Sequence, residues 1–337
     1  MGSRLRDVAQ LAGVSVKTVS NVVNGYQFVS AATRSKVEAA LRELDYRPNV
    51  SARNLRRGRS GMIAVGLPSI RNAYFAELAQ LLVKEAESRS LTVLIDCTDG
   101  VADREHRLTE GFHADFVDGV ILCPWRLTST DLTTRRDRTP LVLLGERLHE
   151  TADSVGIDSR AAARAATEHL LERRCARIGL VMPPRDSVSA VVMDLRRDGY
   201  REAIEAAGHS FTPELIAFPP TDGPADVAAA VEHLLAAGVD GLFCFNDDLG
   251  LAAMRAARAR GYRVPEDVAV IGIDDIAASR VTTPTLSTVA PDKEGIARSA
   301  VAALTRRIDA AADGLEAGPP LAVSAEFTVV ARESTRR

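Results

Sequence analysis

The chain has 337 residues, 46% of them apolar, and a formal net charge of −3. This length exceeds that of one typical domain, and the composition indicates a globular protein with well-buried cores. No stretch approaches the roughly 20 apolar residues of a membrane span, and we expect no signal peptide. The four cysteines and six histidines are dispersed along the chain without metal-ligand spacing. We therefore expect buried reduced thiols, no metal site and no cofactor.

The N-terminal segment predicts two short helices joined by a tight turn. Small and apolar side chains recur at helical spacing over 8–12, and Gly13 ends this run. Ser15 is placed to cap a second helix over 16–23, which closes at Asn24 and the glycine after it. Two helices joined by a short glycine-containing turn form the helix-turn-helix layout, whose second helix enters the major groove of DNA.

A third helix is predicted to complete a small core in this head. Ser30 caps it, Val37, Leu41 and Leu44 recur one turn apart, and Pro48 ends it. On the second helix, the valines at 19, 22 and 23 are predicted to face this core. The residues predicted to face outward are Val16, Lys17, Ser20 and Asn21.

The charge of the chain is unevenly distributed. Residues 1–60 contain eleven Lys and Arg against four Asp and Glu, so they carry a net charge of +7. The other 277 residues of a chain that totals −3 therefore carry −10. A strongly basic end on an acidic body is expected to turn toward a polyanion, where the release of counterions supplies affinity. The alternative is an ordinary helical subdomain with a solvated basic face, but motif and charge together favour DNA binding.

The rest of the chain alternates short apolar strands with longer amphipathic helices. This order predicts parallel sheets with helices on both faces. The predicted strands are 62–67, 91–95, 119–122, 141–144, 178–181, 242–245 and 268–271, and the helices between them include 75–88, 159–172, 195–207, 226–237 and 249–260. In such sheets, ligands bind beyond the carboxyl ends of the strands. No dinucleotide, Walker or nucleophile-elbow motif follows any of these strands, so those chemistries lack support.

Spaced motifs along nearly the whole chain resemble the lactose-repressor (LacI/GalR) family of bacterial transcription factors. In the head, they are Asp7-Val8-Ala9, Ala12-Gly13-Val14-Ser15, Thr18-Val19-Ser20, Val22 and Asn24-Gly25, followed by Tyr46-Arg47-Pro48-Asn49, Ala52 and Leu55. In the body, they are Phe243, Asn246-Asp247, Ala253-Met254, Pro265, Asp267-Val268, Gly272 and Asp274-Asp275.

The resemblance implies an all-α helix-turn-helix head, a short hinge, and an α/β core of two doubly wound parallel-sheet lobes similar to periplasmic sugar-binding proteins. We expect the head over 1–47 and the hinge over 48–60. The expected N-terminal lobe is 61–159 with 291–318, and the C-terminal lobe is 160–290 with 319–332. Three strands cross between the lobes, and we place these crossings near 158–160, 289–291 and 319–321.

The hinge is expected to fold only on DNA. Asn49 can cap a helix over 50–57, but so short a helix is unstable alone in water. In the family, a hinge leucine wedges into the minor groove, and Leu55 occupies that place here, with Ala52 and Arg53 beside it. The alternative for Leu55 is packing against the head. For the arginines of this segment, the alternative to phosphate contact is a solvated linker.

The family's base-reading positions fall on Val16, Lys17 and Asn21. Lysine can donate to guanine, asparagine pairs well with adenine, and valine suits a thymine methyl group. Many relatives carry arginine where this chain has Asn21, so we expect a shifted half-site. Phosphate-positioning roles are expected for Ser15, Thr18, Asn24 and Thr33, each of which could instead be a cap or turn residue. The outward-facing Ser20 is also expected to contact DNA.

The resemblance also implies an effector pocket between the lobes. Arg196 matches the family's ligand-gripping arginine, and Asn246 and Asp274 match its polar ligands at strand ends. Arginine, amide and carboxylate groups suit vicinal hydroxyls, so we expect a small polar effector, a sugar or sugar derivative. The alternatives are a surface ion pair for Arg196 and turn formation for the other two. Candidates to stack on a sugar ring are Tyr74, Phe75 and Trp125, although Trp125 could instead pack between the lobes.

The implied mechanism is a two-state switch in a homodimer. Ligand that bridges the lobes changes their angle and so the spacing of two hinges on a palindromic operator. The candidate dimer interface is the helix 75–88, and no leucine-heptad tail follows residue 332, so we expect a dimer. We expect a cytoplasmic, nucleoid-associated repressor. A sugar-transport protein would have no use for the basic head, and an enzyme would need a nucleophile, base or metal in the cleft.

Overall fold

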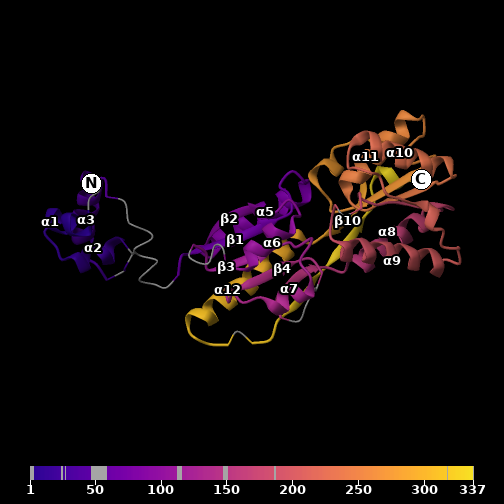
Figure 1. The fold of residues 1–337 in the computed structure, drawn as a ribbon. Coiled ribbons are helices and arrows are strands. Elements are labelled where there is room, and N and C mark those ends of the chain that lie inside the picture. The colour runs from indigo at the N-terminus through magenta and orange to yellow at the C-terminus, as the bar shows by residue number, and fades with distance from the viewer. Residues whose placement is uncertain are drawn as a thin grey trace. The chain divides into compact units, whose positions relative to one another are not determined.

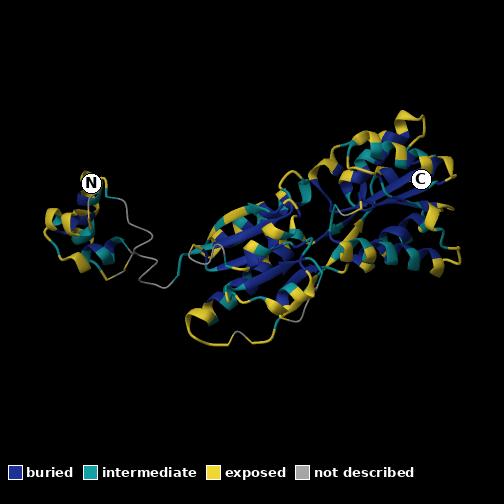
Figure 2. Ribbon diagram, in the orientation of Figure 1, coloured by how far each residue is buried: buried dark blue, intermediate teal, exposed yellow. Residues whose placement is uncertain are grey.

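The computed structural model describes residues 4–23, 26, 28–46, 59–111, 116–146, 151–185, 187–316 and 318–336. Contacts divide the chain into two compact units, 1–60 and 61–337 (Figure 1). Each unit has its own buried core (Figure 2). None of the helices in the described ranges combines the length and the hydropathy needed to cross a bilayer.

The first unit is a three-helix head. Its helices are α1 (Leu5–Ala12), α2 (Val16–Val23) and α3 (Ala31–Glu43). Gly13 ends α1 with a φ of 63°, a left-handed conformation that favours glycine. Val8, Val19 and Val37 are each 0% exposed, so one valine from each helix meets at the centre. The head therefore has the predicted helix-turn-helix layout. However, α3 ends at Glu43 rather than at Pro48, which lies outside the described residues.

The second unit contains two lobes, each built on one six-stranded sheet. The first sheet has the order β11-β5-β4-β3-β1-β2, and all of its neighbouring strands are parallel. Its strands are β1 (Met62–Leu67), β2 (Thr92–Cys97), β3 (Gly119–Leu122), β4 (Leu141–Leu144), β5 (Asp153–Ile157) and β11 (Ala322–Ala325). Its helices are α5 (Ala73–Ser88), α6 (Ala102–Thr109), α7 (Ser129–Thr134) and α12 (Lys293–Ala312).

Helices cover both faces of this first sheet. The core on one face contains residues of α5 and α12, and the core on the other contains Leu108 of α6 and Leu132 of α7. This arrangement explains why β1, β3 and β4 are nearly continuous apolar runs: strands buried on both faces have no polar side to alternate with. By contrast, β2 lies at the edge of the sheet and exposes part of its length.

The second sheet has the order β12-β10-β9-β8-β6-β7, parallel except for the β10–β12 pair. Its strands are β6 (Ile178–Val181), β7 (Ile216–Ala217), β8 (Gly241–Cys244), β9 (Ala269–Ile273), β10 (Ser287–Pro291) and β12 (Phe327–Val330). Its α-helices are α8 (Ser159–Glu172), α9 (Ala190–Ala206), α10 (Pro224–Ala236) and α11 (Asp247–Ala259). Short 3-10 helices are η1 (Pro213–Leu215), η2 (Ala277–Arg280) and η3 (Glu333–Thr335).

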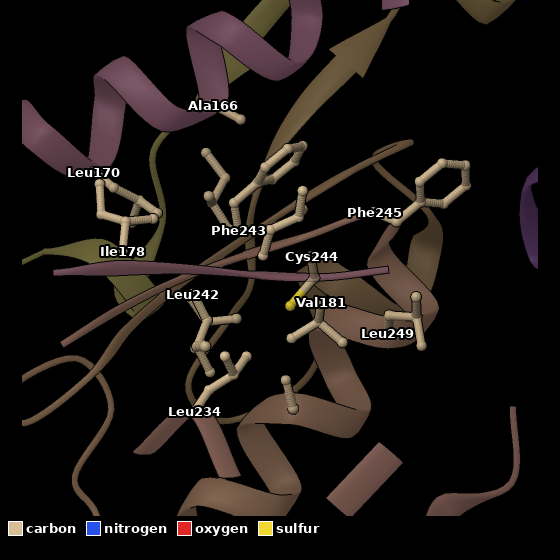
Figure 3. Packing of buried hydrophobic residues seen from close by; sticks show 14 of the residues in the cluster. Ala166, Leu170, Ile178, Val181, Leu234, Leu242, Phe243, Cys244, Phe245 and Leu249 are labelled. Atoms are coloured by element: carbon tan, nitrogen blue, oxygen red, sulfur yellow. The ribbon is translucent and has the colours of Figure 1, made fainter. Parts of the chain in front are cut away.

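Successive side chains of β8 serve opposite faces of the second sheet. Figure 3 shows Phe243 on the side of Ala166 and Leu170, which belong to α8, and Leu242 on the side of Leu234, which belongs to α10. Phe243 and Leu242 are both 0% exposed. Burial on both faces accounts for the unbroken apolar run that marked this strand in the sequence.

The chain crosses between the lobes three times, and the last crossing differs from the prediction. The first crossing lies at Asp158, which caps α8, and the second lies at Asp292, between β10 and α12. The third was expected near 319–321, but β11 pairs with β5 in the first sheet, so the crossing falls at Glu326, between β11 and β12. Residues 319–325 thus belong to the N-terminal lobe. A short exposed edge strand with no buried face leaves too weak a periodic pattern to reveal this.

Candidate functional site

A cavity of about 160 Å3 lies between the two lobes of the core. It is lined by loops that directly follow strands β3, β4, β8 and β9, which is where parallel sheets bind ligands. The structure brings all six predicted effector residues into its lining: Tyr74, Phe75, Trp125, Arg196, Asn246 and Asp274. That they bind an effector remains a prediction.

Arg196 is a buried cation that faces this cavity. Its side chain rises from α9, and the residue is 8% exposed. Its Nη1 donates a hydrogen bond to the carbonyl oxygen of Phe245, and its Cζ lies 4.3 Å from the centre of the Phe245 ring. Its Nε is buried and has no hydrogen-bond partner among the described residues. Burial lowers the pKa of the guanidinium, and the carboxylate of Asp274 opposes that shift. A buried donor without a partner suits an acceptor supplied by a ligand.

Asp274 provides the complementary acceptor. It follows β9, is 7% exposed and has a φ of 121°, a conformation that a residue with a side chain rarely adopts. No described residue donates a hydrogen bond to its carboxylate. Burial raises its pKa well above the usual value, against the opposing effect of Arg196. The pair therefore offers one donor and one acceptor to a hydroxyl-bearing ligand.

Two asparagines at the cavity also cap helices. The Oδ1 of Asn246 accepts the N–H of Leu249 at 3.0 Å and caps α11. The Oδ1 of Asn72 accepts the N–H of Phe75 at 3.3 Å and caps α5, while its Nδ2 donates to Asp248 across the lobes at 3.1 Å. The turn-forming alternative for Asn246 therefore coexists with its place in the lining.

Aromatic and apolar side chains make up the wall from the first lobe. The ring centres of Phe75 and Trp125 lie 6.1 Å apart, and those of Tyr74 and Phe75 lie 5.4 Å apart. Burial raises the pKa of the Tyr74 hydroxyl above its ordinary range and that of the Cys123 thiol to about 12, so both groups are neutral at physiological pH. The cavity thus has a polar side in the C-terminal lobe and a largely apolar one in the N-terminal lobe.

Contacts that sequence reasoning missed hold the lobes together beside the cavity. Glu77 on α5 accepts the N–H of Ala277 from η2 at 2.8 Å and also pairs with Lys293. The Nζ of Lys293 donates in turn to the carbonyl oxygen of Asp275 at 3.0 Å. These groups are far apart in sequence and carry no motif, so only the fold reveals them.

A buried carboxylate organises the loop that reaches across the lobes. Asp247 is 0% exposed and accepts hydrogen bonds from Thr288 Oγ1 at 2.7 Å, Ser279 Oγ at 2.7 Å and Ile276 N at 3.1 Å. Burial raises its pKa to about 6, and these hydrogen bonds oppose the shift. The carboxylate of Asp247 therefore fixes the segment that contains Ala277 through hydrogen bonds on both sides of that residue.

The head presents a polar face on its second helix. Val16 is 44% exposed, Lys17 is exposed, and Thr18, Ser20 and Asn21 are partly exposed. Ser15 accepts the N–H of Thr18 at 3.1 Å, as a cap does. Thr33 also takes part in a cap: its backbone N–H donates to Ser30 Oγ at 3.2 Å, and its hydroxyl oxygen accepts a hydrogen bond from the Ser30 hydroxyl at 2.8 Å.

Four of the predicted DNA-binding residues lie outside the described residues: Asn24, Ala52, Arg53 and Leu55. Sequence reasoning also passed over two exposed aromatic side chains of the head. Tyr26 and Phe28 are 53% and 87% exposed, and their rings pack edge to face at 5.6 Å.

The cysteines are free, and no metal cluster is present in the described ranges. Cys175 and Cys244 are buried as expected, whereas Cys97 and Cys123 are partly exposed. Within those same ranges, no three His, Cys, Asp or Glu side chains lie close enough together to hold a metal ion.

Both parts of the chain match known families. Residues 4–49 match "Bacterial regulatory proteins, lacI family", and residues 167–335 match "Periplasmic binding protein-like domain". The ribose operon repressor of Halalkalibacterium halodurans is 33% identical over 288 residues, which cover 85% of this chain and 84% of that protein.

Two solved structures extend the similarity over nearly the full length. The complex of the transcriptional regulator CelR with cellobiose is 30% identical, with a TM-score of 0.71, and the alignment covers 98% of this chain and 99% of that one. The lac repressor dimer bound to operator and the anti-inducer ONPF is 25% identical, with a TM-score of 0.83 and 99% of both chains covered.

Proposed function

Because the chain belongs to the LacI family of bacterial transcriptional regulators, we propose that it is a repressor that binds a palindromic operator as a homodimer and responds to a sugar-type effector. Membership of this family also argues against the alternative of an α/β enzyme, because the relatives are transcriptional regulators. The site of action would be the bacterial cytoplasm, where the chromosome lies.

The observation that carries the proposal is the convergence of Arg196 and Asp274 on one cavity between the lobes. The buried Nε of Arg196 has no partner in the described chain, and an unsatisfied group of this kind costs about 1–3 kcal/mol of folding free energy. A ligand with adjacent hydroxyls would supply both partners at once, because each hydroxyl donates and accepts. A stable cavity that holds such a pair is therefore better suited to binding than to packing.

The apolar side of the cavity supports a ring-shaped effector. Trp125 and Phe75 offer flat apolar surfaces opposite the polar pair, as suits a sugar with hydroxyl edges and a C–H face. The relatives named above include a ribose operon repressor and a cellobiose complex. The positions Cys123, Gly145 and Val192 also line the cavity and offer no charge or amide, so the ligand of another family member should not be assumed.

Two exposed apolar surfaces support a homodimer. Leu94 and Ile95 on the edge strand β2 are 38% and 46% exposed, and Val281 after η2 is 81% exposed. The contact between Glu77 and Ala277 links α5 to η2, so both lobes contribute apolar surface near the predicted interface helix. Exposed apolar patches on an edge strand mark interaction sites. A dimer also supplies the two heads that a palindrome requires.

In this proposal, effector acts by changing the equilibrium between lobe arrangements. A ligand that touches both lobes favours the arrangement in which those contacts are made, and that arrangement sets the spacing of two heads. Whether the ligand releases or strengthens DNA binding depends on which arrangement the operator prefers.

Binding to a random DNA duplex library tests the proposal. The full chain is selected at two salt concentrations, with residues 61–337 as the control, and then with a panel that contains D-ribose and cellobiose. We expect one enriched near-palindrome that requires the head, weakens steeply with salt, and shifts with at least one sugar. Failure to enrich any site, with and without the panel, would contradict the DNA-binding proposal. Enrichment with no response to any sugar would contradict the effector class alone.

A further inference from the structure

Glu105 on α6 is a buried carboxylate with an unusual set of partners. The residue is 0% exposed. Its two carboxylate oxygens accept three consecutive backbone N–H groups, those of Trp125 at 2.8 Å, Arg126 at 2.9 Å and Leu127 at 3.0 Å. An ionised carboxylate is costly to bury unless hydrogen bonds replace its hydration. Here the fold supplies those bonds from one short loop, so the loop and the carboxylate depend on each other.

That loop carries the aromatic wall of the cavity. It follows β3 directly, and Trp125 lines the cavity between the lobes. The indole packs closely against Gly100, because a Cβ on that residue would lie 2.6 Å from the ring atom Cε3. The Nε of Arg126 donates to the carbonyl oxygen of Gly100 at 3.2 Å. The ring of Trp125 thus packs against the loop that contains Gly100, and the backbone of Trp125 is fixed by its hydrogen bond to Glu105.

We infer that Glu105 is the positioning residue of the effector cavity: it fixes the loop after β3 so that Trp125 forms a rigid wall for the apolar face of the ligand. A strand-end loop without this anchor would lose conformational freedom on binding, and that loss weakens affinity. The role of the wall rests on the proposed function, but the placement of Trp125 by Glu105 does not. The two parts can therefore be tested separately.

Trp125 is the only tryptophan of the chain, so intrinsic tryptophan fluorescence reports on this loop alone. The E105Q variant replaces one acceptor oxygen by an NH2 group that faces a backbone N–H. We expect a red-shifted emission and a rise of about twofold or more in the acrylamide quenching constant of the ligand-free protein, since one or two N–H groups lose their acceptor. The G100A variant leaves Glu105 intact but pushes the ring, so its emission should shift as well.

Asp153→Asn is the matched control. Asp153 is another carboxylate of the same lobe with 0% exposure, but it binds Arg306 and Arg307 at the start of β5. D153N should lower Tm and leave emission and quenching unchanged. An E105Q protein that loses stability while its quenching constant matches that of D153N would overturn the inference.

Hydrogen exchange of the wild-type chain keeps the inference testable if E105Q does not fold. The amides of residues 125–127 should exchange at least about tenfold more slowly than those of the exposed residues 129 and 130 in the first turn of α7. Rapid exchange at 125–127 would overturn the inference without any variant.

The ligand readout uses cellobiose and D-ribose as probes. If either binds the wild type, E105Q should raise its Kd about tenfold, while D153N changes it less than about twofold. An unchanged Kd in E105Q would overturn the positioning role for binding. If neither probe binds the wild type, the effector proposal loses support, and the fluorescence and exchange measurements still decide whether Glu105 fixes Trp125.

Discussion

The carboxylate of Glu77 in the first lobe accepts the backbone N–H of Ala277 in the second lobe at 2.8 Å. The same carboxylate pairs with Lys293, which is 12% exposed at its side chain and donates to a carbonyl oxygen of the second lobe. This contact joins the lobes beside the cavity. It is therefore placed to report on lobe closure and to influence it.

We expect Glu77→Ala to favour more open arrangements of the two lobes. The variant removes the acceptor of Ala277 N and the partner of Lys293, a loss of about 1–3 kcal/mol for partly buried charged hydrogen bonds. Small-angle X-ray scattering of residues 61–337 should show a larger radius of gyration. Glu85→Ala is the control, because the Glu85 carboxylate pairs with Arg89 at the C-terminal end of the same helix, within the first lobe. Superimposable curves for E77A and wild type would refute the role in closure.

Asp247 gives the core a predicted pH dependence. Burial raises its pKa to about 6 from an ordinary value of 3.8. Between these values the folded state holds a proton that the unfolded state has released, so this group's contribution to stability falls as pH rises through that window. An asparagine can donate its NH2 to Thr288 Oγ1 and accept from Ile276 and Ser279. We therefore expect D247N to gain up to about 3 kcal/mol of unfolding free energy relative to wild type between pH 4 and 7.

Urea unfolding of the core at several pH values measures this difference in unfolding free energy. For D153N, we expect a pH dependence of the opposite sign. Burial raises the pKa of Asp153, but hydrogen bonds from Arg307, Leu321 N and Arg306 outweigh it and hold that pKa below its usual value. The contribution of Asp153 is thus present above its unfolded pKa and lost in acid, so D153N should lose stability relative to wild type as pH rises. A stability difference that does not rise with pH for D247N would contradict the assignment of Asp247, and one that does not fall with pH for D153N would contradict that of Asp153.

The sequence predicted the buried parts of the fold better than its edges. The strands β1, β3, β4 and β6 have the predicted bounds because burial on both faces makes them unbroken apolar runs. The edge strand β7 and the crossing strands β11 and β12 are short or lack a dense apolar pattern, so they were missed. The interior strands β5 and β10 were missed as well, because polar residues interrupt their apolar runs although both strands are largely buried. The third crossing was misplaced for the same reason.

The residues that line the cavity could be predicted from strand ends and family motifs. The residues that hold the cavity walls in place could not. Arg196, Asn246 and Asp274 stand at positions that topology brings together. Glu105 reaches Trp125 across 20 residues and Glu77 reaches Lys293 across 216, and neither glutamate differs in sequence from a solvated helix residue. Long-range polar contacts depend on the exact packing of elements, which periodicity alone does not specify.

Replacement of Arg196 by methionine should separate effector binding from stability. The variant removes a buried charge whose Nε has no partner in the described chain, together with the bond to Phe245 O. Loss of the guanidinium leaves no uncompensated charge when Asp274 is protonated, and burial already raises the pKa of that carboxyl group well above its usual value. We expect Tm within a few degrees of wild type, roughly a hundredfold loss of sugar affinity, and operator binding that no longer responds to effector. Retained response in R196M would show that the cavity does not bind the effector through this residue.

Ile95→Glu tests the dimer. Ile95 is 46% exposed on the edge strand β2, so a charge there is tolerated in a monomer but is costly in an apolar interface. Sedimentation equilibrium should show a dimer for wild type and a monomer for I95E at micromolar concentration, with operator affinity lowered at least about tenfold. Ala206→Glu places the same charge on an exposed position of α9 and should leave the dimer intact. A dimeric I95E would move the interface away from β2.

Lys17 and Asn21 should determine which bases the second helix reads. Lys17 is exposed on α2, and Asn21 is partly exposed one turn later on the same helix. Loss of a direct base contact costs about 1–3 kcal/mol and relaxes preference at one base pair, whereas loss of a phosphate contact weakens all sequences alike. We expect K17A and N21A each to relax one position of the half-site in a selection from random duplexes. Lys36→Ala removes the same charge from an exposed position of α3 and should leave the selected sequence unchanged. If K17A and K36A select the same site as wild type and differ only in salt slope, Lys17 contacts phosphate, and the reading of bases falls to Asn21 and Val16.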